Sequence, residues 1–534
     1  MFRQLVTPVA DNLTLSFLVA TLPIAIVLLL LGVARRPAWQ ASIVGVLVAL
    51  LLSIFVWQLP AGLALNSVAA GATFAAWPVM WIVLNALLLY NVAVASGSFD
   101  AFSGWMVRHL PNDRRVALIV IGFAFGCLLE GVAGFGAPIA ITSALLVSLG
   151  FPAVEAVVFT LMFNTAPVAF GALGSPIITL SAVTQLHDVA LGAMVGRQLP
   201  IIALLLPFYV IAVYGGLRAI RGVWPILLVA GGSFASMQFL SSNFLGYALT
   251  DVLSSLASLV CTLLFVKLWR FTPDPAFALR TAGTPDAPSA AAGNGLKGWL
   301  PWLILSATVI LWVHLKLNLI GEVKMPWPGL HDAIFITTYG RSYAAIWSFQ
   351  PLATGTAILV ATIITALLVR LSLAQLSAAL RRTFVQIRLP LMTTMTIVGL
   401  AYLMNYSGMA YTLGVGVASV GPLFPLVSAF LGWLAVFLSG SDTSGNALFG
   451  NLQVVAARQL DLDPVLMAAT NASGGVLGKM ISPQNISTGT STTDCRGQEG
   501  AILARTFKHS IFLTLLLGVI VMLQQYAFSW MIPA

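Results

Sequence analysis

One motif occurs twice in this chain, at residues 164–176 and again at 471–483. Each copy reads Asn, six residues, Gly, three residues, then Ser-Pro. Upstream of the copies stand two acids, Glu130 and Asp442, each placed 22 residues before a proline. A duplicated unit that carries an acid and helix breakers is typical of proteins that build one central site from two halves. The sequence therefore predicts two structural repeats.

The composition indicates a membrane protein. Hydrophobic residues make up 59% of the chain and charged residues only 8%, against roughly 25% charged in an average soluble domain. Continuous apolar runs, rather than short alternating strands, favour helices over a β-barrel. We expect an all-α polytopic membrane protein with about 12 to 14 transmembrane helices. The clearest runs are 13–33, 41–59, 72–95, 199–216, 247–269, 299–317, 351–370 and 510–530.

The basic residues predict the orientation in the membrane. The net charge of +9 is not gathered in a patch that would suggest nucleic acid. It lies at the ends of apolar runs, which is the positive-inside pattern. With these ends in the cytoplasm, both termini and the loop 318–350 are expected outside, and the first apolar run is interpreted as retained. The basic clusters are Arg35/Arg36, Arg108/Arg114/Arg115, Arg218/Arg221, Lys267/Arg270 and Arg381/Arg382/Arg388.

We divide the chain into two membrane halves. Residues 1–270 hold the first repeat and 299–534 the second, and 271–298, rich in Pro, Ala and Gly, is predicted to be a cytoplasmic linker. The segment before Glu130 starts from a basic end, whereas the segment before Asp442 does not. The two copies are therefore expected to enter the membrane from opposite faces, as inverted repeats with interrupted helices.

The interruptions are predicted at 130–140 and 440–448, where glycines and N-cap residues replace membrane residues. New helix N-termini there would offer N–H groups and partial positive charge to an anion. The structural alternative is close helix packing through small residues. The candidate substrate ligands around these breaks are Gly134, Gly136, Asn164, Ser175, Ser441, Thr443, Ser444, Asn446, Asn471, Lys479, Ser482 and Gln484.

Charged residues complete the predicted site. Glu130 and Asp442 are candidates for proton coupling, because a buried acid can carry a proton across a membrane; either could instead cap a helix. Lys479 aligns with Ala172 of the first copy, so only one half carries this positive charge. It could hold a carboxylate, reach the interface or pair with Asp442. Arg197 could attract anions at an outer mouth or anchor a helix. No metal spacing or cofactor motif is present in the sequence.

Five segments carry a resemblance to a known family. They read EGVAGFGAP at 130–138, NTAPVAFG at 164–171, GRQLP at 196–200, GSDTS at 440–444 and GGVLGKMISPQ at 474–484. The chain resembles the bacterial L-lactate permease family from its first helix to its last. One departure is the segment 487–498, which is more polar than we expect there.

The resemblance implies a symporter of the bacterial cytoplasmic membrane that imports lactate, and often glycolate, with a proton. Its partners would be a small carboxylate, the proton and the bilayer. A carrier for another small organic acid and an anion channel remain open as alternatives. An enzyme is not expected, because the sequence shows no convergent catalytic set. Nothing in the sequence indicates the oligomeric state.

Overall fold

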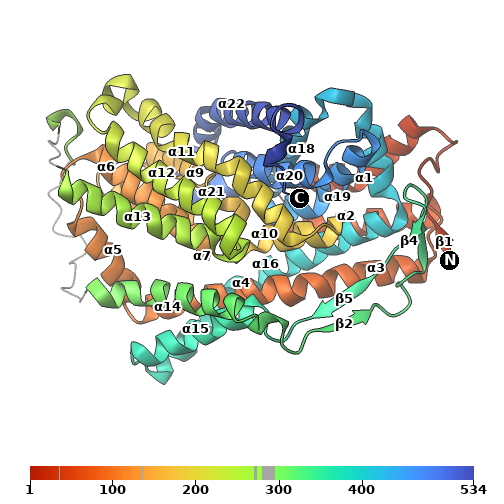
Figure 1. The fold of residues 1–534 in the computed structure, drawn as a ribbon, viewed down its shortest axis with the longest axis horizontal. Helices are drawn as coiled ribbons and strands as arrows, with labels where there is room; N and C mark the ends of the chain where they lie inside the picture. The colour runs from red at the N-terminus through yellow and green to blue at the C-terminus, as the bar shows by residue number, and fades with distance from the viewer. Residues whose placement is uncertain (35, 133, 135, 270–273, 280–294, 534) are drawn as a thin grey trace.

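The structure, a computed structural model, describes residues 1–34, 36–132, 134, 136–269, 274–279 and 295–533. It is built almost entirely of helices, which confirms the predicted all-α class (Figure 1). The predicted linker 271–298 falls largely outside the described residues. The first part of the chain holds β1 (Phe2–Arg3), α1 (Leu13–Gly32), α2 (Ala38–Phe55), α3 (Ala61–Phe74), η1 (Ala75–Met80), α4 (Trp81–Ala95) and α5 (Ser98–Arg108).

The first repeat and the helices after it complete the N-terminal half. The repeat consists of α6 (Arg114–Ala117), η2 (Leu118–Phe125), α7 (Gly126–Val132), α8 (Ala137–Ser148), α9 (Ala153–Phe163), η3 (Val168–Phe170) and α10 (Gly171–Thr184). The helices that follow are α11 (Asp188–Arg221), α12 (Trp224–Leu240), η4 (Ser241–Leu245), η5 (Tyr247–Leu249), α13 (Thr250–Leu268) and η6 (Pro275–Phe277).

The C-terminal half contains the second repeat. Before it come α14 (Gly295–His314), η7 (Leu317–Leu319), β2 (Val323–Pro326), β3 (Ile334–Ile336), β4 (Arg341–Ser342), β5 (Ile346–Phe349), α15 (Thr354–Leu368), α16 (Leu373–Ser407), α17 (Met409–Val417) and η8 (Ala418–Leu423). The repeat and the end of the chain are α18 (Phe424–Ser439), α19 (Asp442–Gln459), α20 (Pro464–Lys479), α21 (Pro483–Ser491), α22 (Glu499–Tyr526) and η9 (Ser529–Met531).

Ten helices among the described residues are long and apolar enough to cross a membrane, or eleven when α9 and the bent segment after it are taken as one span. The chain is therefore a multi-pass membrane protein. The prediction of 12 to 14 crossings also included α14 and α15. The latter has only 15 residues, which is shorter than the roughly 20 helical residues that cross a full hydrocarbon core.

Buried side chains form two large cores. One is built from α4 to α13 together with α18, α20 and α22, and it contains most of both repeats. The other joins α1, α2, α3, α16 and α17 with the strands and with α19 of the second repeat. The structure thus consists of a repeat-bearing part and a flanking part, each with its own apolar interior.

Each repeat consists of a helical hairpin followed by a broken helix. α8 packs back along both η2 and α7, and Thr142 lies opposite Gly126. In the same way α18 and α19 fold against each other, with Val436 beside Gly445. Our prediction that 130–140 and 440–448 interrupt continuous helices was therefore wrong. These segments are hairpin turns, because the chain reverses direction there.

The interrupted helices lie in the second part of each repeat. α9 and the segment 168–184 are bent by 64° at the break that follows Asn164. In the second repeat, α20 ends at Lys479 and α21 begins at Pro483, after Ser482 as its N-cap. Proline suits the first turn of a helix, since the N–H that it lacks would have no partner there. Both breaks therefore fall on the duplicated motif.

The two repeats pack as symmetric partners. α8 of the first packs on α21 of the second, and α10 of the first packs on α19 of the second. α8 corresponds to α19 in the other repeat, and α10 corresponds to α21. Exchanging the two repeats therefore turns one of these contacts into the other. This is the arrangement that one shared site between duplicated halves requires.

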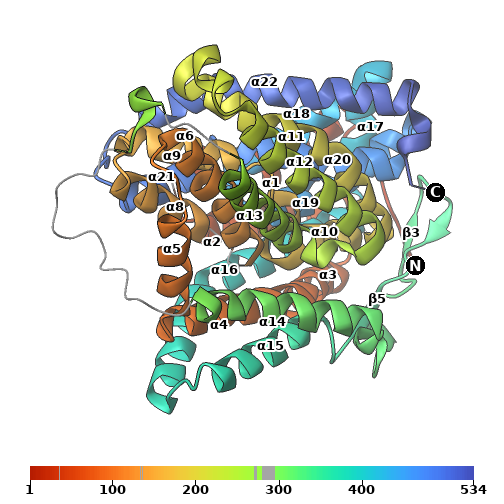
Figure 2. The ribbon, with the colours of Figure 1, turned by 60° about the vertical axis from the view of Figure 1, so that its left-hand side comes forward.

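The ends of the molecule agree with the predicted polarity. The strands lie at one end and α5 and α6 at the opposite end (Figures 1 and 2). β1 pairs with β3, and β2 pairs with β5, so the chain start and the loop 318–350 share one end as expected. The first hairpin starts from α6. The second follows α17, where Thr412 donates to the carbonyl of Val6 at the strand end. The hairpins thus enter from opposite ends.

Glycines allow α18 and α20 to approach closely. A side chain at Gly432, Gly474 or Gly478 would overlap backbone atoms of the other helix. We expect Gly474→Ala to destabilise the protein by about 1–3 kcal/mol, the usual effect of overpacking. Gly62→Ala is the matched control, because nothing lies within 4 Å of a Cβ there. Thermal unfolding in detergent should show a lower midpoint for Gly474→Ala alone; equal midpoints would contradict this packing.

Candidate functional site

A cavity of about 990 Å³ lies where the two repeats meet. Its inner wall comes from the hairpin turn at Gly134, the break before α10, the turn 439–444 and the break between α20 and α21. Its open end is lined by Arg36 and Ser487, both exposed. Arg36 belongs to a predicted cytoplasmic cluster, so the cavity opens toward the predicted cytoplasmic side.

The first turn of α10 has left-handed backbone. Ala172, Leu173 and Gly174 have φ values of 44°, 56° and 81°. Left-handed backbone costs non-glycine residues roughly 1–2 kcal/mol each, and such strain is concentrated at functional sites. The turn lets a regular helix restart at Ser175-Pro176, and both of these residues line the cavity.

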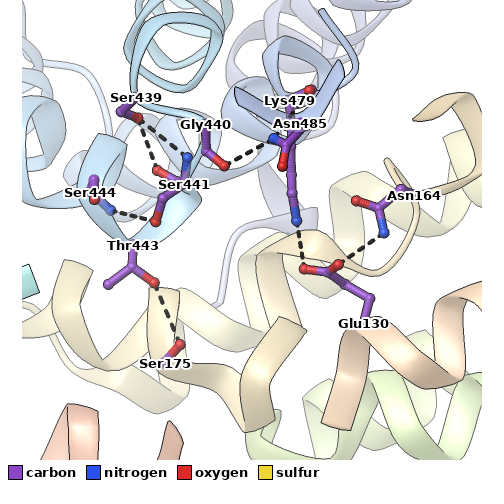
Figure 3. A network of polar contacts seen from close by, with 10 residues as sticks. All are labelled: Glu130, Asn164, Ser175, Ser439, Gly440, Ser441, Thr443, Ser444, Lys479 and Asn485. Atoms are coloured by element: carbon purple, nitrogen blue, oxygen red, sulfur yellow. Dashed lines mark hydrogen bonds and ion pairs between the residues drawn. The ribbon is translucent and has the colours of Figure 1, made fainter. Parts of the chain in front are cut away.

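The turn of the second hairpin is held by side chains of both repeats. Ser441 caps α19 by accepting from the N–H of Ser444 (3.4 Å). Asn485 donates to the carbonyl of Gly440 (3.1 Å), and Ser175 and Thr443 lie 3.5 Å apart between their hydroxyl oxygens (Figure 3). The N-terminal residues of α10, α19 and α21 therefore line one cavity, with the partial positive charge of helix N-termini.

Lys479 and Glu130 form an ion pair across the repeats. Lys479 Nζ lies 2.6 Å from Glu130 Oε1, and Asn164 Nδ2 donates to Glu130 Oε2 at 3.0 Å (Figure 3). The side chains of the pair are 7% and 4% exposed, and both residues line the cavity. Gly171 makes room for the carboxylate, since a Cβ there would lie 3.0 Å from Oε1. The interpretation that Lys479 pairs with Asp442 was wrong, because the partner of Lys479 is Glu130.

Asp442 is the second acid of the cavity wall. It is the first residue of α19 and is buried. Asn446 donates to its Oδ2 at 3.3 Å, whereas Oδ1 has no hydrogen-bond partner among the described residues. The cap of α19 is Ser441, so Asp442 is not needed as the capping residue. This oxygen is buried and lies against Gly475 of α20. A buried carboxylate oxygen without a hydrogen-bond partner favours a proton on that carboxyl group.

This arrangement suits a small anion. The inner wall holds one ammonium group, two carboxyl groups, several hydroxyl groups and three helix N-termini. Helix N-termini and a lysine bind carboxylates. A bound anion would compete with Glu130 for Lys479, so anion binding and the charge of Glu130 are linked.

The predicted ligands separate into two groups. Seven line the cavity together with Glu130 and Asp442, namely Gly134, Ser175, Ser441, Thr443, Ser444, Lys479 and Gln484. The other five are placed behind that lining. Asn164 holds Glu130, Asn471 holds Asn446, and Asn446 donates to the carbonyl of Pro176 at 3.2 Å. Gly136 is the N-cap of α8 and Ser482 that of α21. Direct contact of any of these residues with substrate stays a prediction.

Arg197 has structural partners. Its Nε donates to Asn243 Oδ1 and its NH1 to the carbonyl of Met531, each at 2.8 Å. It is not among the residues that line the cavity. These contacts favour the anchoring interpretation over an anion-attracting mouth.

Sequence reasoning missed two residues near the site. Asn485, beside the predicted Gln484, lines the cavity and holds the second hairpin turn. Asp251 on α13 is fully buried next to Gly131. The rarity of acids inside membrane segments is the signal that could have singled out Asp251.

Comparison with known proteins agrees with this geometry. The chain matches the L-lactate permease family over residues 16–528. It is 40% identical to the L-lactate permease of Bacillus subtilis (strain 168) over the full length of both chains. It is 38% identical to a glycolate permease of Escherichia coli (strain K12), with 98% of each chain covered.

A solved structure shares the fold. The antimetabolite efflux pump MtrF of Neisseria gonorrhoeae aligns with a TM-score of 0.50 at 11% identity, covering 94% of this chain and 97% of that one. The family match and the full-length relatives carry the assignment. The chain belongs to the L-lactate permease family.

Proposed function

We propose that the protein imports L-lactate, and related 2-hydroxy monocarboxylates such as glycolate, together with a proton across the bacterial cytoplasmic membrane. The observation that carries the proposal is the Lys479–Glu130 ion pair in the cavity wall. Relatives along the whole chain are named for lactate and glycolate. A cavity with one lysine suits a monoanion better than a dianion, which would bring a second charge.

The ion pair suggests how substrate and proton are coupled. When the lactate carboxylate binds Lys479, Glu130 loses its partner. An unpaired buried carboxylate is costly, so Glu130 takes up a proton. The bound lactate and proton together have no net charge. Their movement into the cell is therefore not opposed by the membrane potential. Release of both to the cytoplasm restores the ion pair.

The second acid has a supporting part in this proposal. Asp442 lines the same cavity as Lys479, and its carboxyl group can accept a hydrogen bond from the 2-hydroxyl group of the substrate or take a proton. The hydroxyl groups of Ser441 and Thr443 offer further hydrogen bonds. A 2-hydroxy acid thus finds partners for both of its functional groups.

Uptake into proteoliposomes tests the function. Radiolabelled L-lactate should accumulate under an inward pH gradient, with a rate that saturates and that excess glycolate lowers. Excess succinate should compete poorly, because it carries two charges. Uptake that does not saturate would indicate a channel, and stronger competition by succinate than by glycolate would contradict the substrate class.

A further inference from the structure

A third buried acid lies next to the ion pair, outside the cavity lining. Asp251 is 0% exposed. Ser255 donates to its Oδ1 at 3.4 Å, whereas Oδ2 has no hydrogen-bond partner among the described residues. A Cβ on Gly131, the residue after Glu130, would lie 3.1 Å from that Oδ2. Asp251 thus packs directly against the turn of backbone that carries Glu130.

The groups around Asp251 supply no free positive charge that would balance an ionised carboxylate. The titratable groups nearby are Glu130 and Cys127 on α7, Lys479 on α20 and Tyr247 on η5. Lys479 is paired with Glu130, and the hydroxyl of Tyr247 donates to Asp188 at 2.7 Å. The other segments packed on α13, which are α10, α12, η2, η3 and η4, have no ionisable side chain. An ionised Asp251 would be a buried charge without a cation of its own, so the neutral, protonated form is favoured.

Its position also separates it from the substrate. Asp251 is absent from the cavity wall and lies in the first turn of α13, four residues after Tyr247. Tyr247 hydrogen-bonds to Asp188, whose side chain is 41% exposed. The opposite end of α13 carries Lys267, which belongs to a predicted cytoplasmic cluster. Glu130 therefore faces the cavity, and Asp251 approaches it from the end of the helix that is predicted to be outside.

We propose that Asp251 is a second proton site of this transporter, which supplies Glu130 from the side opposite the cavity. Asp251 holds a proton while Glu130 is paired with Lys479. When the substrate carboxylate draws Lys479 away, the O–H bond on Asp251 breaks and one forms on Glu130. Asp251 then regains a proton from outer water. The inference rests on the proposed proton symport and adds the route by which the proton arrives.

The structural alternative is a partner of the helix dipole, since an acid in the first turn of a helix is favourable there. A dipole partner would be ionised, whereas the proton site is protonated at rest. Infrared spectra of the parent at rest, without lactate, should show the band of a protonated carboxylic acid. The part of that band due to Asp251 should be missing in Asp251→Asn.

Transport assays complete the test in proteoliposomes. Asp251→Asn should lower pH-driven lactate uptake on the order of 100-fold, as for loss of a proton-transfer group. Exchange of labelled for unlabelled lactate should continue, which also shows an intact fold. Ser258→Ala, which removes another buried hydroxyl group of α13 that donates to the carbonyl of Ala230, should transport like the parent.

The outcomes separate this inference from the function on which it rests. If the parent moves lactate without protons, both are overturned. If the parent couples lactate to protons and Asp251→Asn does so equally, only the inference is overturned. An unchanged carboxylic acid band in Asp251→Asn also overturns it, even for a variant that fails to transport.

Discussion

Replacement of Lys479 by alanine is expected to raise the half-saturation concentration for lactate by about 10- to 100-fold. A hydrogen bond to a charged group contributes about 1.5–3 kcal/mol, and 1.4 kcal/mol is a factor of ten in binding. Lys479 is the cation on the inner cavity wall, with its Nζ 2.6 Å from Glu130. Initial rates of lactate uptake over a range of concentrations measure the effect.

Two further variants define the role of the lysine. Lys479→Arg should recover part of the affinity, because the planar guanidinium keeps the charge but does not fit the place of a compact ammonium. Lys508→Ala is the matched control, since that lysine is exposed on α22 and lies outside the cavity lining. An unchanged half-saturation in Lys479→Ala, at normal membrane expression, would remove Lys479 from the substrate site.

Glu130→Gln is expected to abolish accumulation of lactate under a pH gradient while leaving exchange of labelled for unlabelled lactate. Glutamine keeps the size of the side chain and can still accept from Lys479 or Asn164, but it cannot take up a proton. Exchange need not release the proton, so it continues. Parallel accumulation and exchange assays on the same proteoliposomes measure the difference.

A half-buried acid outside the cavity lining provides the control for this variant. Glu155 lies in the first turn of α9, away from the cavity lining. Glu155→Gln should accumulate lactate like the parent. If Glu130→Gln also accumulates lactate like the parent, Glu130 is a structural residue and Asp442 becomes the candidate for proton coupling.

The sequence was sufficient to predict the repeats and several residues of the inner cavity wall. The duplicated Asn-Gly-Ser-Pro spacing and the acids 22 residues before a proline identified the two repeats, although the interruptions were predicted at the hairpin turns and not at the motif. These features are local, because prolines, glycines and caps act on the backbone within a few residues. Lys479 was also accessible from sequence, as the one charge that breaks the symmetry of the motif.

The direction of the chain at the turns was not accessible in this way. A Gly-rich segment after Glu130 can either restart a helix along the same axis or reverse it, and both choices use the same residue types. The choice depends on packing, here of Thr142 opposite Gly126. The partner of Lys479 was missed for a related reason, since Glu130 lies 349 positions away in the chain.

The roles of the residues behind the cavity lining could not be predicted either, because their partners depend on tertiary contacts. Asn164 and Asn471 belong to the same motif position, yet one holds Glu130 and the other holds Asn446. Asp251 lies in an apolar helix, and none of its neighbours in sequence indicates a contact with α7. Only the fold shows that Gly131 brings it next to Glu130.

The coupling of lactate to protons is the central claim, and a lactate-driven proton flux tests it most directly. Proteoliposomes without a pH gradient, loaded with a pH-sensitive dye, would receive external L-lactate at zero membrane potential. The proposed symport predicts rapid acidification of the interior in the parent and none above leak in Glu130→Gln. Lactate entry without acidification in the parent would contradict proton symport.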